Sequence, residues 1–170
     1  MSERDRWLAA GDEELARDCE EERFRSGGPG GQHRQKNATG VRLHHRPSGV
    51  SAAASESRSL AENRRRALRR LRLRIACEVR ERFQGDAFAW PAELARYIAG
   101  GAVRIDPRNP DYARLAALAL DALLASQGRY AAAARAVGLS TSQFVGLLER
   151  APEVRRAAAA LRAASGDGAG

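Results

Sequence analysis

The sequence predicts an α+β fold: a small domain of short β-strands and one long helix, followed by a small all-α domain with a helix-turn-helix-like motif. Two short apolar segments flank a Pro-Ser-Gly turn at residues 47–49, and a segment with helical apolar spacing follows them. Aromatic residues make up only 5% of the chain, so much of the 44% hydrophobic content is Ala, which favours helices over sheets. The 170 residues suffice for two small domains, which we expect at 1–84 and 91–164, with a disordered tail at 165–170.

The strands of the first domain are short. Asp12 is expected to cap a brief helix, and residues 20–25 to form a first strand. Two more strands are expected at residues 41–43 and 50–52, joined by the Pro-Ser-Gly turn. These elements predict a modest sheet that needs a helix to cover it.

That covering helix is predicted to begin after a capping-box pattern formed by Ser59 and Glu62. Its apolar residues, spaced three or four apart, are Leu68, Leu71, Ile75, Val79 and Phe83. Seven arginines are expected on the rest of its surface: Arg64, Arg65, Arg66, Arg69, Arg70, Arg72 and Arg74.

The second domain is predicted to consist of helices only. A boundary is expected at residues 85–90, and Ser140 with Gln143 repeats the capping-box pattern. The segment around Gly138 predicts the turn of a helix-turn-helix. The expected helices cover residues 91–99, 109–126, 129–137 and 140–150, with a last helix from Pro152.

The net charge of +8 is unevenly distributed. Residues 1–22 hold three Arg against nine acidic residues, whereas residues 23–82 hold sixteen basic residues against four acidic ones. A central segment this basic favours binding to a polyanion, above all nucleic acid. Two cysteines exclude a disulfide framework, and the sequence shows no signal peptide or membrane span, so we expect a cytoplasmic protein.

A glycine-rich segment is the most specific motif in the chain. Residues 25–33 read Arg-Ser-Gly-Gly-Pro-Gly-Gly-Gln-His. Such a segment can direct backbone N–H groups at angles that other residues forbid. Because Gln32 follows Gly31, it is not a Walker phosphate-binding loop, and its glycine spacing does not fit the dinucleotide-binding fingerprint. Short strands expected on both sides favour a functional loop over a linker.

This segment resembles the catalytic signature of class I peptide chain release factors and related ribosome-rescue hydrolases, which carry Gly-Gly-Gln at this place. The resemblance covers residues 20–83, about half of the chain. It continues through Lys36, Val41-Arg42-Leu43, His45, Pro47-Ser48-Gly49-Val50, Arg58-Ser59 and Asn63-Arg64. It implies that the loop enters the peptidyl transferase centre and promotes attack of water on the ester between the nascent peptide and tRNA.

The chemistry of that reaction explains the residue types. Ester hydrolysis passes through a tetrahedral oxyanion, which a correctly directed backbone N–H stabilises. Gly30 and Gly31 permit the geometry that directs the N–H of Gln32, and the Gln32 amide can position the water. We therefore assign Gly30, Gly31 and Gln32 as catalytic residues. Ribosome and tRNA hydroxyls would carry the proton, so no carboxylate is needed in the loop.

Basic residues near the loop and on the long helix are assigned to rRNA or tRNA phosphates. His33 is assigned as a contact rather than a base, and His44 and His45, adjacent on one strand, do not form a metal pair. We expect no metal and no cofactor. The assigned RNA-binding residues are Arg25, His33, Arg34, Lys36, Arg42, Arg64, Arg65, Arg66, Arg69, Arg70, Arg72 and Arg74.

The expected function is therefore ribosome-dependent peptidyl-tRNA hydrolysis in translation release or rescue, by a monomer that binds ribosome and tRNA and no membrane. Full release factors carry further domains that read the stop codon, for which 170 residues leave no room, so we expect no stop-codon recognition. Short rescue hydrolases carry a basic C-terminal tail, but residues 163–170 contain no basic residue. The helical half is thus the candidate for recruitment.

Two alternatives remain. The family's residues after the loop differ here at Gln35, Ala38 and Thr39, which suits a ribosome- or RNA-binding factor without hydrolysis. The helix-turn-helix also suggests a DNA-binding regulator, but its second helix offers a single positive charge, at Arg150, whereas DNA binding needs several phosphate contacts.

Overall fold

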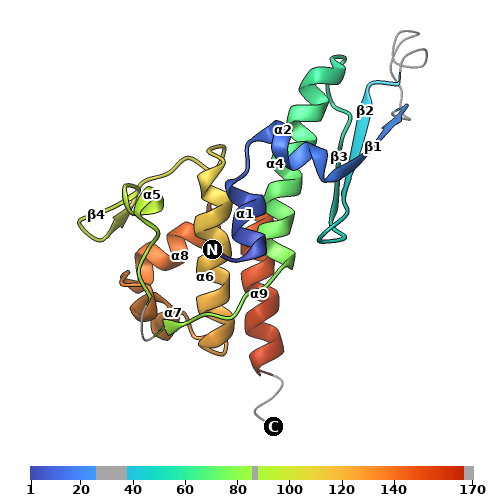
Figure 1. The fold of residues 1–170 in the computed structure, drawn as a ribbon. Helices are drawn as coiled ribbons and strands as arrows, with labels where there is room; N and C mark the ends of the chain where they lie inside the picture. Colours follow the sequence, from blue (N-terminus) through green and yellow to red (C-terminus); the bar gives the residue numbers. More distant parts are fainter. Residues whose placement is uncertain (26–37, 86–87, 167–170) are drawn as a thin grey trace.

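The computed structural model describes residues 1–25, 38–85 and 88–166, and the predicted α+β class is confirmed in these ranges (Figure 1). The strands are β1 (Cys19–Phe24), β2 (Gly40–His45), β3 (Ser51–Ala54), β4 (Ile98–Ala99) and β5 (Ala102–Val103). The helices are α1 (Glu3–Ala9), α2 (Asp12–Arg17), α4 (Leu60–Glu78), α5 (Ala92–Ala95), α6 (Asp111–Ala125), α7 (Tyr130–Ala136), α8 (Thr141–Glu149) and α9 (Pro152–Gly166). Among these helices, none combines the length and the apolarity that crossing a bilayer requires.

The first half of the chain is an antiparallel sheet in the order β1-β2-β3, covered on one face by α4. Side chains of β2 alternate across the sheet, with Val41 and Leu43 buried and Arg42 exposed. The turn between β2 and β3 closes at Gly49, which has a φ of 72°. Leu68, Leu71 and Ile75 of α4 are buried in the same core as the apolar residues of β2 and β3, as the spacing predicted.

Helix α4 begins as expected but ends earlier. The hydroxyl oxygen of Ser59 accepts a hydrogen bond from the backbone N–H of Glu62. The helix ends at Glu78, because Val79 takes an extended conformation. Phe83, predicted on the helix, therefore lies beyond it and packs 5.1 Å from the ring of Phe88 in the second core.

The prediction for Asp12 is also wrong in detail. Helix α2 starts at Asp12 itself, with Gly11 in the capping position and no side-chain cap. The carboxylate of Asp12 instead binds Arg72 of α4 at 2.8 Å. A long-range ion pair thus replaces the local cap.

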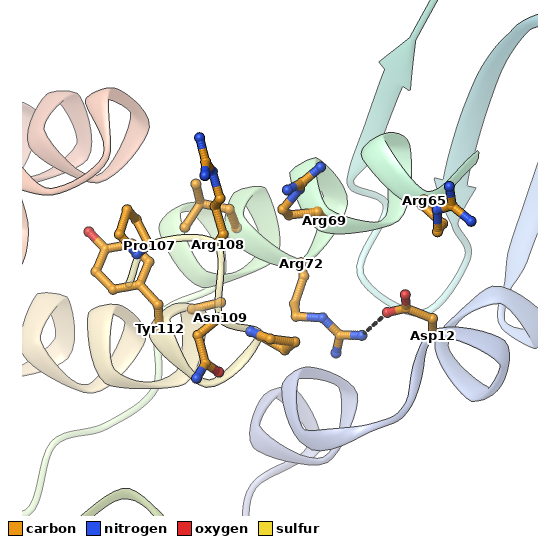
Figure 2. A pocket seen from close by; sticks show the side chains of 11 residues that line it. Asp12, Arg65, Arg69, Arg72, Pro107, Arg108, Asn109 and Tyr112 are labelled. Carbon is orange, nitrogen blue, oxygen red and sulfur yellow. Dashed lines mark hydrogen bonds and ion pairs between the residues drawn. The ribbon is translucent and has the colours of Figure 1, made fainter. Parts of the chain in front are cut away.

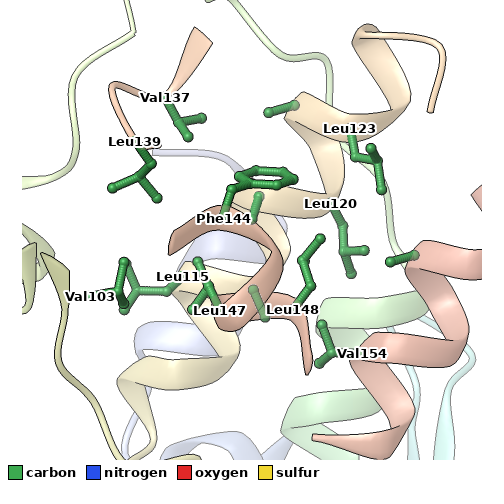
Figure 3. Close-up of a cluster of buried hydrophobic side chains, with 14 of the residues drawn as sticks. Val103, Leu115, Leu120, Leu123, Val137, Leu139, Phe144, Leu147, Leu148 and Val154 are labelled. Atoms are coloured by element: carbon green, nitrogen blue, oxygen red, sulfur yellow. The ribbon is translucent and has the colours of Figure 1, made fainter. Parts of the chain in front are cut away.

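The second half is helical, with α6 at its centre, apart from the short β4–β5 hairpin. The predicted helix over residues 91–99 is confined to α5, because Ile98 pairs with Val103 across the turn at Gly100 and Gly101. Figure 3 shows the core of this half. Its labelled residues, all buried, are Val103, Leu115, Leu120, Leu123, Val137, Leu139, Phe144, Leu147, Leu148 and Val154.

The predicted helix-turn-helix is formed by α7 and α8. Gly138 at the turn has a φ of 71°, and the Ser140 hydroxyl oxygen accepts from the N–H of Gln143. Helix α9 continues to Gly166, so Ser165 and Gly166, expected in the tail, are helical.

The two halves are in contact. Helix α1 packs against both α4 and α6, and α9 packs against α4 (Figure 1). Ala113 and Ala117 of α6 are buried in the core of the first half, whereas Leu73 and Cys77 of α4 pack on the second core. Small residues on α6 allow the close approach of α4.

Candidate nucleic-acid interface

The residues assigned to catalysis lie outside the described ranges. Gly30, Gly31 and Gln32, and with them His33, Arg34 and Lys36, belong to the segment 26–37. Phe24 at the end of β1 pairs with Gly40 at the start of β2. The glycine-rich segment therefore connects two strands that are neighbours in the sheet, as the short flanking strands suggested.

The strand ends that carry this segment are tightly packed. A Cβ atom at Gly40 would lie 2.8 Å from the carbonyl oxygen of Phe24 and from Cε2 of its ring. Only glycine fits there, so Phe24 can lie directly over the neighbouring strand. The Arg42 guanidinium lies 5.4 Å from the centre of the Phe24 ring and covers it further.

Asn63 fixes the chain on the C-terminal side of the segment 26–37. This fully buried side chain on α4 donates from Nδ2 to the carbonyl oxygens of Thr39, at 2.7 Å, and Ser57, at 2.8 Å. Its Oδ1 accepts from the Ser57 N–H at 2.9 Å. One amide thus holds the chain before β2, the turn before α4 and the helix together. The sequence showed Asn63 only as part of the family resemblance, and its three hydrogen bonds appear in the structure alone.

Most of the arginines assigned to RNA are engaged within the protein. Arg64 forms ion pairs with Glu13 at 2.8 Å and Glu21 at 2.9 Å, and these contacts raise the pKa of its guanidinium. Four more arginines pair with one carboxylate each: Arg42 with Glu22, Arg66 with Glu62, Arg70 with Glu56 and Arg74 with Glu78. Hydrogen bonding to Arg70 lowers the pKa of Glu56 to about 2.

Arg72 does not lie on the surface, contrary to the expectation for the α4 arginines. Its side chain is buried and donates to the carbonyl oxygens of Leu8 and Ala10, at 3.0 and 2.7 Å, as well as to Asp12. It joins α4 to the α1–α2 connection. Arg72 therefore stabilises the fold and is not available to a phosphate.

Arg25, Arg65 and Arg69 are the assigned arginines that are exposed and form no ion pair within the described residues. Arg65 and Arg69 line a cavity of about 290 Å³ together with Arg108, from the segment before α6 (Figure 2). Asp12 is the acidic residue of its lining, and its carboxylate is turned to Arg72. The cavity is therefore strongly positive.

The histidines of β2 have structural roles. His45 is buried, its Nδ1 lies 2.7 Å from the Ser48 hydroxyl in the β2–β3 turn, and its ring meets Trp7 edge-on at 4.9 Å. Burial lowers the pKa of His45. Nδ1 of His44 lies 2.8 Å from the Ser51 hydroxyl on β3. In the part of the chain that the structure describes, no three His, Cys, Asp or Glu residues gather in a way that suits a metal ion.

The helix-turn-helix presents little positive charge. Arg150, predicted on the second helix, is the C-terminal capping residue of α8 and directs its guanidinium to the backbone carbonyls of Ile105 and Val103, the latter at 2.5 Å. The Gln143 side chain accepts from the Val103 N–H at 3.0 Å. These two residues bind the neighbouring β4–β5 segment, which argues against a DNA-reading surface.

Comparison with known proteins finds a match in the first half of the chain. Residues 13–90 match the RF-1 domain. This match confirms the predicted resemblance to release factors, and it contains β1–β3, α4 and the Gly30-Gly31-Gln32 segment. Residues 91–170 lie outside it.

Similar curated proteins are bacterial peptide chain release factors 1. That of Dictyoglomus thermophilum is 46% identical over 59 residues, which are 35% of this chain and 16% of the relative. That of Chlorobaculum tepidum is 50% identical over 52 residues, 31% of this chain and 15% of the relative. That of Leuconostoc citreum is 48% identical over 65 residues, 38% of this chain and 18% of the relative. The match thus spans less than a fifth of the length of these relatives.

Proposed function

We propose that this protein hydrolyses the ester bond of peptidyl-tRNA on the ribosome, rescuing stalled complexes without reading a stop codon. The observation that carries the proposal is the RF-1 domain match, which includes Gly30-Gly31-Gln32 between two paired strands. Curated relatives that match part of this chain are named peptide chain release factor 1. The protein would act on the large ribosomal subunit.

In this mechanism the backbone N–H of Gln32 stabilises the oxyanion, and the two glycines before it allow the required backbone angles. The Gln32 side chain positions the attacking water. The described surroundings support this role, because Gly40 and Asn63 hold the roots of the segment against the sheet and α4. A rigid base reduces the entropic cost of placing the catalytic amide.

Phosphate contacts would bring the segment to its substrate. Arg34 and Lys36 flank the catalytic residues in sequence, with His33 as a contact beside them. Arg25, Arg65 and Arg69 add guanidinium groups that no described carboxylate neutralises. The arginines already paired with glutamates contribute less, because binding a phosphate requires them to exchange one anion for another.

The test is peptide release from ribosomes stalled at the end of a truncated mRNA, with wild type, Gly31→Ala and Gln32→Ala. Wild type is expected to release the peptide, and Gly31→Ala to lose release while it keeps ribosome binding. Gly146→Ala is the matched control, because a Cβ there meets no atom within 4 Å. Ribosomes with a stop codon or a sense codon in the decoding site measure codon dependence directly.

Each outcome decides between the alternatives. If wild type binds these ribosomes but releases no peptide, catalysis is refuted and the non-catalytic ribosome-binding factor is supported. Faster release at stop codons than at truncated ends would refute codon-independent rescue. Equal release by wild type and Gly31→Ala would show that the Gly-Gly-Gln segment is not the catalyst.

A further inference from the structure

The cavity lined by Arg65, Arg69 and Arg108 combines residues from both halves of the chain (Figure 2). The first two lie on α4 within the RF-1 domain, whereas Arg108 lies outside the matched residues, in the segment before α6. Spacings of four and three residues place Arg65, Arg69 and Arg72 on one face of α4. The cavity therefore exists only where the helical half meets the RF-1 domain.

The charge of this cavity is uncompensated. Arg72 at its base is neutralised by Asp12, and Figure 2 shows the Arg72 side chain turned toward that carboxylate. Arg65, Arg69 and Arg108 are exposed and form no ion pair with a described residue. The α4 arginines on the other faces, Arg64 among them, are paired with glutamates. Three free guanidinium groups around one hollow are a site for an anion.

The dimensions favour a piece of nucleic-acid backbone. The volume of about 290 Å³ lies just below the range, about 300 to 1,000 Å³, that is typical of small-molecule pockets. Pro107 and the buried Tyr112 give the cavity a fixed wall, since the Tyr112 hydroxyl donates to the carbonyl of Leu147 at 3.0 Å. A guanidinium on either side of a hollow suits successive phosphates of one strand.

We propose that this cleft binds backbone phosphates of ribosomal RNA, so that the helical half contributes directly to ribosome binding through Arg108. The identity of the RNA as ribosomal rests on the proposed function. The cleft binds RNA and takes no part in the hydrolysis. It gives residues 91–166 a role in recruitment, which the RF-1 domain match leaves open.

The test measures binding of the full chain to large ribosomal subunits and to protein-free large-subunit rRNA over a series of KCl concentrations. The variants are Arg69→Ala, Arg108→Ala and the double substitution. Arg155→Ala is the control, since Arg155 is an exposed α9 residue that forms no ion pair with a described residue. Arg69 and Arg108 are both exposed, so the variants are expected to fold like wild type, and their unfolding curves check this.

Each cleft substitution removes one charge-assisted hydrogen bond, so it is expected to weaken binding to subunits and to rRNA about tenfold. Arg155→Ala is expected to bind like wild type. The slope of log affinity against log salt should become shallower by about 0.7 to 0.9 for each phosphate that the variant no longer neutralises. Cleft variants that match Arg155→Ala would overturn the proposal. So would weaker binding to subunits without weaker binding to rRNA, because the partner would then be a ribosomal protein.

Uridine monophosphate separates an RNA strand from a free nucleotide as the source of the phosphate. If wild type binds the nucleotide through Arg69 and Arg108 while neither substitution weakens binding to rRNA, the cleft is a mononucleotide site and the proposal fails. Binding and release are measured separately, so the two proposals can fail separately. Arginine-dependent binding without peptide release refutes only the hydrolase, whereas release with unaltered binding of the cleft variants refutes only the cleft.

Discussion

Arg4 and Asp121, 117 positions apart in the sequence, form an ion pair in the interior of the protein. Arg4 Nη1 donates to Asp121 Oδ2 at 2.5 Å, and the side chains are 1% and 2% exposed. The other carboxylate oxygen accepts from Arg80 at 2.9 Å and from the Glu81 N–H at 3.1 Å. This network joins α1, the chain after α4 and α6, and so fixes the helical half against the first half of the chain.

Asp121→Asn is expected to destabilise the protein by about 3 to 5 kcal/mol, because it removes the carboxylate that the partly buried Arg80 pairs with and leaves the buried Arg4 with Asp5 as its remaining described counter-charge. Urea denaturation measures the free energy of unfolding. Glu22→Gln, which removes the exposed pair with Arg42, is the control and should cost at most about 1 kcal/mol. Equal losses in the two variants would show that burial of the Asp121 network has no special importance.

Arg72 and Arg69 should respond differently to the same substitution. Arg72→Met removes donors to two backbone carbonyls and to Asp12, and we expect a loss of about 2 to 4 kcal/mol in unfolding free energy. Arg69→Met should change it by no more than about 0.5 kcal/mol, since Arg69 is exposed and unpaired within the described residues. Thermal unfolding of both variants makes the comparison. Strong destabilisation by Arg69→Met would contradict the finding that Arg69 is exposed and forms no ion pair within the described residues.

Asn63→Ala is expected to lower both stability and peptide release. Its three hydrogen bonds hold Thr39 and Ser57, so we expect a loss of about 2 to 4 kcal/mol and a reduced rate constant of release on bound ribosomes. Ser51→Ala, which removes one bond to His44 in the same sheet, is the control and should retain release. Single-turnover release at a temperature where both variants are folded is the measurement. Unchanged release in Asn63→Ala would exclude a positioning role.

Stability should fall as the pH decreases below about 6.5. Burial lowers the pKa of His45 from its usual value of 6.5, so the unfolded chain takes up a proton on this residue before the folded chain does. The contribution is fully present above pH 6.5 and is lost as the pH falls toward the folded-state pKa. His45→Gln should flatten the pH dependence of the unfolding free energy below pH 6.5. An unchanged slope in this variant would refute the assignment to His45.

Local patterns in the sequence predicted the elements well. The alternation of β2, the turn at Gly49, the capping serines of α4 and α8 and the helix-turn-helix all appear in the described ranges. Each depends on interactions within a few residues, such as a serine oxygen that accepts a nearby N–H, so the residue types suffice to predict it. The Gly-Gly-Gln motif is likewise formed by consecutive residues. It predicted a resemblance to release factors, and residues 13–90 match the RF-1 domain.

Only the tertiary structure decided which arginines pair with carboxylates and which remain free to bind an anion. In sequence, the acidic residues 1–22 and the basic residues of α4 are separate blocks, and the basic block looked free to bind RNA. In the fold, Asp12, Glu13 and Glu21 return to α4, bury Arg72 and pair Arg64, and leave Arg65 and Arg69 free beside Arg108. Ion pairs of this kind join residues about 40 to 60 positions apart, and no local pattern encodes which partners meet.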